Sequence, residues 1–184
     1  VIQVLGTLIF SLMAAYPLAR MDFRGRDTIF AIILATLMIP ETVTMVPNFL
    51  TVTWLHRNTP VPWLNNWLSL TVPFLTSAFS IFLLRQFMRG IPNDLWEAAR
   101  IDGAGHVRFL FRIVLPLCRP PLLTVGMFTF IGSWNSLAWP LLVTNYSDWR
   151  PISVGLQQFV SEAGAEINLQ MAGAVIATIP VLIV

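Results

Sequence analysis

The sequence predicts an all-α protein that crosses a membrane several times. Hydrophobic residues make up 56% of the 184 positions and charged residues only 11%, and the mean hydropathy is +0.73. Soluble domains carry about 25% charged residues, so this chain has too few to cover a surface in water. Its apolar residues also form runs close to the roughly 20 residues of helix that cross a bilayer. These observations predict a polytopic helical membrane protein.

Five apolar segments define the expected spans. They are Val1–Leu18, Thr28–Leu50, Leu68–Leu84, Pro120–Leu141 and Asn168–Val184. The second and third contain prolines, which membrane helices tolerate where neighbouring helices or cavity water satisfy the freed carbonyl groups. Because the chain starts at valine and its last apolar run stops short, we expect one transmembrane domain over residues 1–184 that is truncated at both ends. The full chain is expected to have six spans.

The basic residues orient these spans. All 11 of them are arginine, and nine lie in the loop around Arg24 and in the long loop from Arg85 to Arg119. Loops rich in arginine stay in the cytoplasm, so these two are expected inside. The two loops expected outside are flanked by tryptophans, as interfacial belts are. These are Trp54, Trp63, Trp67, Trp134, Trp139 and Trp149.

The residue inventory excludes several classes of protein. Without lysine there is no P-loop lysine and no Schiff-base lysine, so the chain is not itself a P-loop ATPase. The single cysteine, Cys118, excludes an internal disulfide and a multi-cysteine metal site. His56 and His106 lie in loops on opposite sides and cannot share a metal. We expect no catalytic residue, no metal and no cofactor, and no nucleic acid as a partner.

The long cytoplasmic loop has the pattern of a short helix. Asn93 is the expected N-cap and Gly103 the residue that ends the helix. One helical face carries Leu95, Ala98, Ala99 and Asp102, at spacings of i, i+3, i+4 and i+7.

The small alanine side chains leave a low surface that another protein could approach closely, and Glu97 and Arg100 supply charges beside it. The alternative is an interfacial helix on the lipid headgroups. The acidic residues of the segment favour a protein partner.

The same loop carries a longer motif. Glu97-Ala98-Ala99 is followed after three residues by Gly103, after nine more by Ile113, and then by Leu115-Pro116. This string resembles the EAA motif of binding-protein-dependent ATP-binding cassette (ABC) importer permeases, without departure at those positions. The surrounding stretch from Ile91 to Ala104 resembles the carbohydrate branch of that family, as do Phe82 to Phe87 and Gly132 to Leu142.

The resemblance implies the type I importer permease fold and a set of partners. Residues 92–112 would form a cytoplasmic segment whose coupling helix, near residues 93–107, docks into an ATPase dimer. Glu97 would pair with a basic residue of the ATPase, and Gly103 would allow the sharp turn. The other partners implied are a second permease subunit, homologous rather than identical, an extracytoplasmic solute-binding protein, and the lipid of a bacterial inner membrane.

The substrate pathway is less clear from the sequence. Glu41 is the acidic residue deepest in a predicted span, which favours a functional role. Pro40 breaks the helix beside it, so Glu41 can equally reach the outer interface or bond to freed backbone groups. Ser133 and Asn135 could meet a sugar hydroxyl, but hydrogen bonding between helices is the simpler interpretation.

The predicted outer loop from Thr144 to Ile167 resembles those that touch a loaded binding protein, and a lid packed over the helices is the alternative. It contains Tyr146, Trp149, Arg150 and Phe159.

Taken together, the sequence predicts the permease subunit of an ATP-driven importer for a sugar, a related polyol or a glycerophosphodiester. A secondary transporter driven by an ion gradient is the alternative, but that class needs more buried ionisable groups than Glu41 alone. An integral-membrane enzyme would need a catalytic constellation that the spans do not contain.

Overall fold

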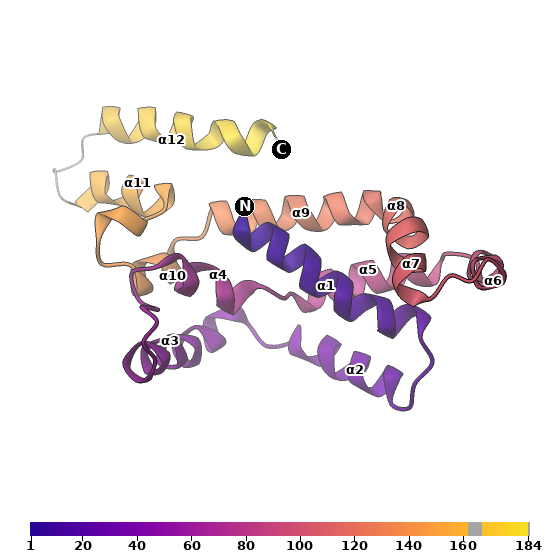
Figure 1. Cartoon of the computed structure of the whole chain (residues 1–184). Helices are drawn as coiled ribbons and strands as arrows, with labels where there is room; N and C mark the ends of the chain where they lie inside the picture. The colour runs from indigo at the N-terminus through magenta and orange to yellow at the C-terminus, as the bar shows by residue number, and fades with distance from the viewer. Residues whose placement is uncertain (162–166, 184) are drawn as a thin grey trace. The chain divides into compact units, whose positions relative to one another are not determined.

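The computed structural model describes residues 1–161 and 167–183, and every regular element within these ranges is helical. The predicted all-α class is therefore confirmed. The chain separates into two compact units, which are described in turn (Figure 1). Unit 1 consists of residues 1–40 and 75–128, and unit 2 of residues 41–74 and 129–184.

Unit 1 is built on α1 and α5, which pack along each other. Its core contains Ala15, Leu84, Met88, Val114 and Cys118, all completely buried. The elements of this unit are α1 (Ile2–Arg20), α2 (Arg26–Thr36), α5 (Ala78–Arg89), α6 (Asn93–Ile101), α7 (His106–Phe109), the π-helical turn η2 (Leu110–Val114), α8 (Leu115–Leu117) and the first part of α9 (Arg119–Trp134).

Helix α1 has the side-chain distribution of a membrane helix. Its buried face includes Thr7, Ser11 and Ala15, which are small or polar. Its exposed face carries large apolar residues, with Leu5 and Met13 more than half exposed. Small residues at helix contacts and large apolar residues facing outward are typical of helices packed in lipid.

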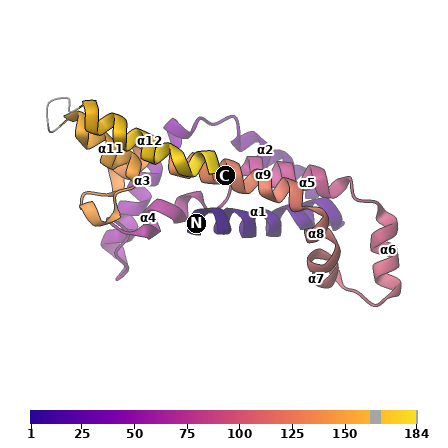
Figure 2. The same ribbon diagram turned by 90° about the horizontal axis from the view of Figure 1, so that it is seen from above.

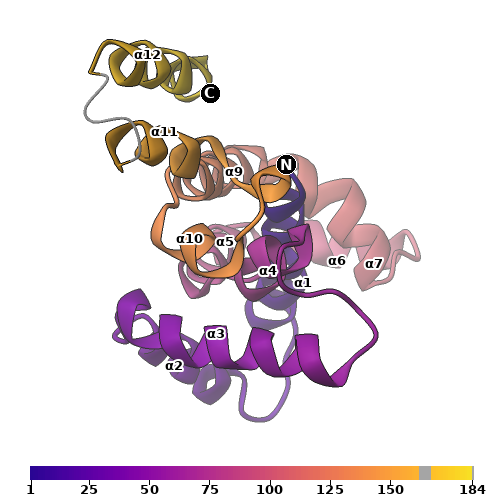
Figure 3. The ribbon, with the colours of Figure 1, turned by 90° about the vertical axis from the view of Figure 1, so that its left-hand side faces the viewer.

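Unit 2 is organised around Trp139 of α10. Helix α10 packs against α4 (Figure 3). The indole Nε1 donates to Ser69 O at 2.8 Å, and the ring packs edge-on against Phe74 at 5.5 Å between centroids. Val52 and Val143 complete the buried cluster. The elements of this unit are α3 (Glu41–Asn58), α4 (Trp67–Thr71), the 3₁₀ turn η1 (Val72–Phe74), the last part of α9, α10 (Ala138–Val143), the 3₁₀ turn η3 (Ser147–Trp149), α11 (Ile152–Ser161) and α12 (Ile167–Ile183).

The five predicted spans are helical, but most of them are interrupted. Among the described residues, α1 alone is a single helix long and apolar enough to cross a membrane, and the number reaches four if three interrupted helix pairs count as one span each. The segment predicted at Thr28–Leu50 is divided into α2, which ends at Thr36, and α3, which begins at Glu41 directly after Pro40. Proline lacks the N–H that a continuous helix needs, which accounts for this break.

The predicted outer loop differs from expectation. Residues 144–167 were expected to be a connection, whereas η3 and α11 occupy much of it. Helix α11 packs against α12. The apolar residues of α11 have helical spacing, but the helix is short, so the sequence did not distinguish it from a loop. The side chain of Phe159 and residues 162–166 lie outside the described part of the chain.

Candidate functional site: the 92–112 segment

The segment of residues 92–112, which contains α6 and α7, lies at the end of unit 1 where α1 and α5 end (Figure 2). Helix α6 exposes Asp94, Glu97 and Ala98, together with Ile101, whose side chain is 87% exposed. In the described part of the chain Glu97 makes no hydrogen bond or ion pair, so its carboxylate is available to a partner.

Ala99 lies on the opposite face of α6 and is only 5% exposed, within the core cluster of unit 1. Ala98 and Ala99 therefore do not form the single shallow apolar surface that the sequence predicts. Ala98 is on the outer face, whereas the small side chain of Ala99 lets α6 approach its own unit closely. Arg100 and Asp102 are exposed beside that outer face.

Helix α6 ends in a Schellman motif, as the position of Gly103 predicts. The Ala104 N–H donates to Ala99 O at 2.8 Å, and the Gly103 N–H donates to Arg100 O at 3.0 Å. Gly103 has φ of +73°, in the left-handed region where glycine is favoured. The motif satisfies carbonyls that the helix end leaves open and turns the chain toward α7.

Replacing Gly103 with alanine should weaken this turn by about 1–2 kcal/mol, because an L-residue is strained at this φ. A Cβ at Gly103 meets nothing within 4 Å, so steric collision adds nothing. We expect the Ala104 amide to exchange hydrogen about fivefold or more faster. The matched control is Gly105→Ala, at φ of −81° and also with open space. Equal exchange in both variants would contradict the prediction.

Aromatic side chains hold the segment against α1. The Trp96 ring stacks on the His106 ring at 4.4 Å and meets Phe109 edge-on at 4.9 Å. The Tyr16 hydroxyl lies 3.0 Å from His106 Nδ1 and donates to His106 O at 3.2 Å. These contacts give His106 a structural role, since its ring and its carbonyl both bind residues of the same unit.

Arg20, the last residue of α1, holds the start of the segment. Its NH1 group donates to Ile91 O at 2.9 Å and to Asn93 Oδ1 at 3.2 Å, and its NH2 group donates to Pro92 O at 3.3 Å. Asn93 was predicted as the N-cap of α6, and this prediction is wrong. Pro92 occupies the cap position, Asn93 is the first helical residue, and no described side chain caps the helix. The Asn93 side chain accepts from Arg20.

Sequence reasoning missed Tyr16, Arg20 and Trp96 as the residues that position the segment. They lie up to 90 positions from their partners, so no local pattern pairs them. The one available signal was Arg20, a basic residue at the end of a predicted span. This signal is not specific, because basic residues are favoured at the C-terminus of any helix.

The predicted pathway residues are not brought together by any hydrogen bond or ion pair in the described ranges. Glu41 begins α3, where it is exposed in the first turn. Ser133 is half-buried near the end of α9, and Asn135 is exposed just after it. The hydrogen bond from this region to another helix is made by their neighbour, because Trp134 Nε1 donates to Ala177 O at 2.9 Å.

The comparisons with known proteins agree on one family. Residues 7–184 match the model of the binding-protein-dependent transport system inner membrane component. The arabinooligosaccharides transport system permease protein AraQ of Bacillus subtilis (strain 168) is 34% identical over 178 residues, which is 97% of this chain and 61% of that protein. The sn-glycerol-3-phosphate transport system permease protein UgpE of Yersinia enterocolitica is 36% identical over 177 residues, 95% of this chain and 61% of that protein.

A solved structure is also similar. It is the crystal structure of a bacterial ABC transporter involved in the import of the acidic polysaccharide alginate, with a TM-score of 0.84 and 28% identity over 99% of this chain and 67% of that one. The chain spans about three fifths of the length of the two curated relatives above. It belongs to the family of binding-protein-dependent transport system inner membrane components.

Proposed function

We propose that this chain is the membrane-spanning permease subunit of an ATP-driven importer and that its 92–112 segment receives force from a cytoplasmic ATPase. The observation that carries the proposal is the two-sided character of α6. Its outer face offers Glu97 and Ala98 without a partner in the described residues, while its inner face is fixed to α1. Such a helix can bind another protein and pass on its displacement.

The inner contacts make the segment move with α1. Arg20 binds three consecutive residues at its start, and Tyr16 binds His106 beyond the turn. Because both anchors come from one helix, α6 cannot shift far without carrying α1. Helix α1 in turn packs along α5. Closure of an ATPase dimer against α6 would therefore tilt these helices. The pathway would then open in turn to the two sides of the membrane.

The alternative of an interfacial helix is less consistent with this face. The exposed carboxylates of Asp94 and Glu97 would face the anionic headgroups of a bacterial inner leaflet, where repulsion disfavours them. A groove with basic residues suits them better. In this proposal ATP hydrolysis belongs to the separate subunit, since the chain has no lysine for a P-loop.

The relatives support a proposal for the remaining partners and the substrate class. A second, homologous permease subunit would complete the pathway, and a solute-binding protein would deliver the substrate at the opposite side. The named relatives transport arabinooligosaccharides and sn-glycerol-3-phosphate, which supports a sugar, polyol or glycerophosphodiester. Glu41, Ser133 and Asn135 are proposed for the pathway.

The test is uptake by the complete transporter in proteoliposomes, with an arabinooligosaccharide and sn-glycerol-3-phosphate as probes. Uptake should require ATP and the binding protein, and it should continue when ionophores remove the proton and sodium gradients. Uptake that stops when the gradients are removed and does not depend on ATP would instead support a secondary transporter.

A further inference from the structure

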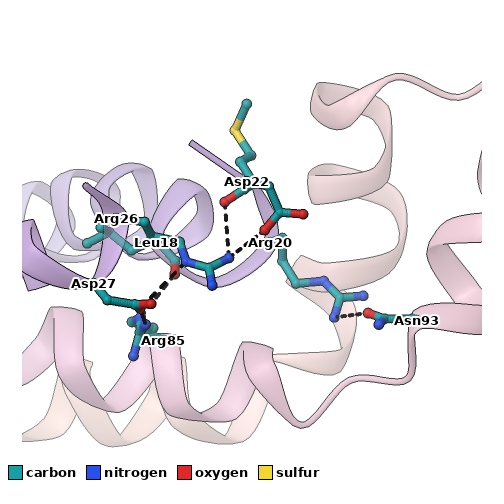
Figure 4. A network of polar contacts seen from close by, with 8 residues as sticks. Leu18, Arg20, Asp22, Arg26, Asp27, Arg85 and Asn93 are labelled. Atoms are coloured by element: carbon teal, nitrogen blue, oxygen red, sulfur yellow. Dashed lines mark hydrogen bonds and ion pairs between the residues drawn. The ribbon is translucent and has the colours of Figure 1, made fainter. Parts of the chain in front are cut away.

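A small polar cavity lies between the ends of α1 and α5 and the start of α6. It encloses about 250 Å³ and is lined by Ala19, Arg20, Asp22, Arg26, Arg89, Asn93 and Trp96. Three of these side chains are cationic and one is anionic, so the lining carries two net positive charges. Figure 4 shows the bond from Arg26 to Asp22 and the bond from Arg20 to Asn93.

The cationic groups keep unused hydrogen-bond donors. Arg20 donates to two backbone carbonyls and to the Asn93 amide oxygen, and none of these acceptors carries a charge. Arg26 NH1 donates to Asp22 Oδ1 at 2.8 Å and to Met21 O at 3.4 Å, and its Nε lies 3.6 Å from Asp27 Oδ1. No bond from its NH2 group is found in the described part of the chain. Arg89 is exposed and makes no hydrogen bond or ion pair with any described residue. Each guanidinium has five N–H donors, so several remain for a ligand.

The position of the cavity limits the class of ligand that it can bind. Arg20 ends the apolar helix α1, and Arg89 ends α5, so the cavity lies where two candidate spans leave the hydrocarbon. Exposed aromatic side chains, Phe23 and Phe87, lie within three residues of these arginines in the sequence. Basic pockets at this depth on the cytoplasmic side are suited to lipid phosphate groups.

We propose that this cavity binds a phosphate group and that its occupant is the headgroup of an anionic phospholipid of the inner leaflet. Arg20 and Arg89 supply charges that no described residue pairs with, and Arg26 supplies further donors. Planar guanidinium groups bind phosphate oxygens in pairs, which suits this arrangement. The volume fits a headgroup rather than a larger ligand, since sites for drug-sized ligands are about 300–1,000 Å³.

The bound lipid would touch the same residues that anchor α6. Arg20 and Asn93 belong both to the cavity and to the clamp at the start of the segment. Occupation would therefore stiffen the joint between α1 and α6. This inference requires insertion in the membrane with the arginine-rich loops inside, but it does not require that α6 docks on an ATPase. An acidic side chain of such an ATPase is the competing occupant.

The experiment titrates phosphatidylglycerol and phosphatidylcholine onto the intact membrane complex in detergent and counts bound lipids by native mass spectrometry. We expect phosphatidylglycerol to bind and phosphatidylcholine to bind far more weakly. Arg89→Gln should weaken phosphatidylglycerol binding about fivefold. The matched control is Arg24→Gln, which removes the same charge from an exposed residue outside the cavity and should leave binding unchanged.

A separate titration with inorganic phosphate distinguishes the source of the phosphate. Phosphate that fails to displace phosphatidylglycerol assigns the site to lipid, and Arg89-dependent displacement assigns it to a soluble phosphate with the same chemistry. Equal binding of the two lipids, or equal effects of the two substitutions, would overturn the proposal. So would phosphatidylglycerol binding that appears only after the ATPase is removed, since the ATPase would then occupy the cavity. Unchanged thermal unfolding of Arg89→Gln excludes misfolding as the cause.

Discussion

Replacing Glu97 with lysine is expected to reduce ATP-driven uptake more than tenfold while the protein remains folded in the membrane. The carboxylate is on the outer face of α6, and no described residue binds it. Reversing its charge therefore breaks no internal contact. Against a basic groove it places like charges together, which costs several kcal/mol at an interface.

The measurement separates coupling from folding. Uptake into proteoliposomes and co-purification of the ATPase should both fall, whereas the thermal unfolding temperature should not. Arg24→Glu is the matched control, because it also reverses an exposed charge and lies in unit 1 outside the 92–112 segment, with no bond to any described residue. Normal uptake by Glu97→Lys would refute docking through this face. An equal loss in the Arg24 variant would show that charge reversal alone is harmful.

Replacing Arg85 with alanine is expected to destabilise unit 1 by about 2–4 kcal/mol. Its side chain is 3% exposed and makes three different contacts. Arg85 Nε donates to Leu18 O at 3.0 Å, and its NH2 group donates to Asp27 Oδ1 at 2.8 Å (Figure 4). The guanidinium carbon also lies 3.7 Å from the centre of the Phe30 ring. The substitution leaves a buried carbonyl unpaired and removes a cation–π contact, which together cost this amount.

Thermal unfolding of the purified protein measures this loss, with an expected fall in Tm of about 5–15 °C. Arg24→Ala is the matched control, an exposed arginine of the same unit that lies outside the cavity described above and makes no bond to any described residue. It should change Tm little. Arg85→Lys should restore part of the loss, since it keeps the charge without the planar fork. An Arg85→Ala variant as stable as the control would contradict the role of this residue.

Sequence patterns predicted what depends on neighbouring residues. The turn at Gly103 needed only a local signal, because a helix that ends in the left-handed region selects glycine. The family could also be recognised, because its motif is continuous along the chain from Glu97 to Pro116. Composition and apolar runs were enough for the all-α membrane class.

Patterns failed where a residue serves two purposes. Asn93 has the chemistry of an N-cap, but its side chain binds Arg20, which lies 73 residues earlier. Ala99 looks identical to Ala98 in sequence, yet Ala98 is exposed and Ala99 is buried in the core of unit 1. Pro40 indicates a possible break at residues 37–40. Membrane helices also tolerate proline, so only the structure shows that the helix is interrupted there.

By itself, the sequence determined the fold class, the family and the presence of a short helix with an acidic exposed face between two apolar segments, because these follow from composition and periods of a few residues. Only the tertiary structure decided how that helix is held and what surrounds it. Tyr16, Arg20, Trp96 and His106 meet through contacts between distant segments, and the cavity with Arg89 exists only after α1, α5 and α6 have converged. Such convergence depends on packing, which no local pattern encodes.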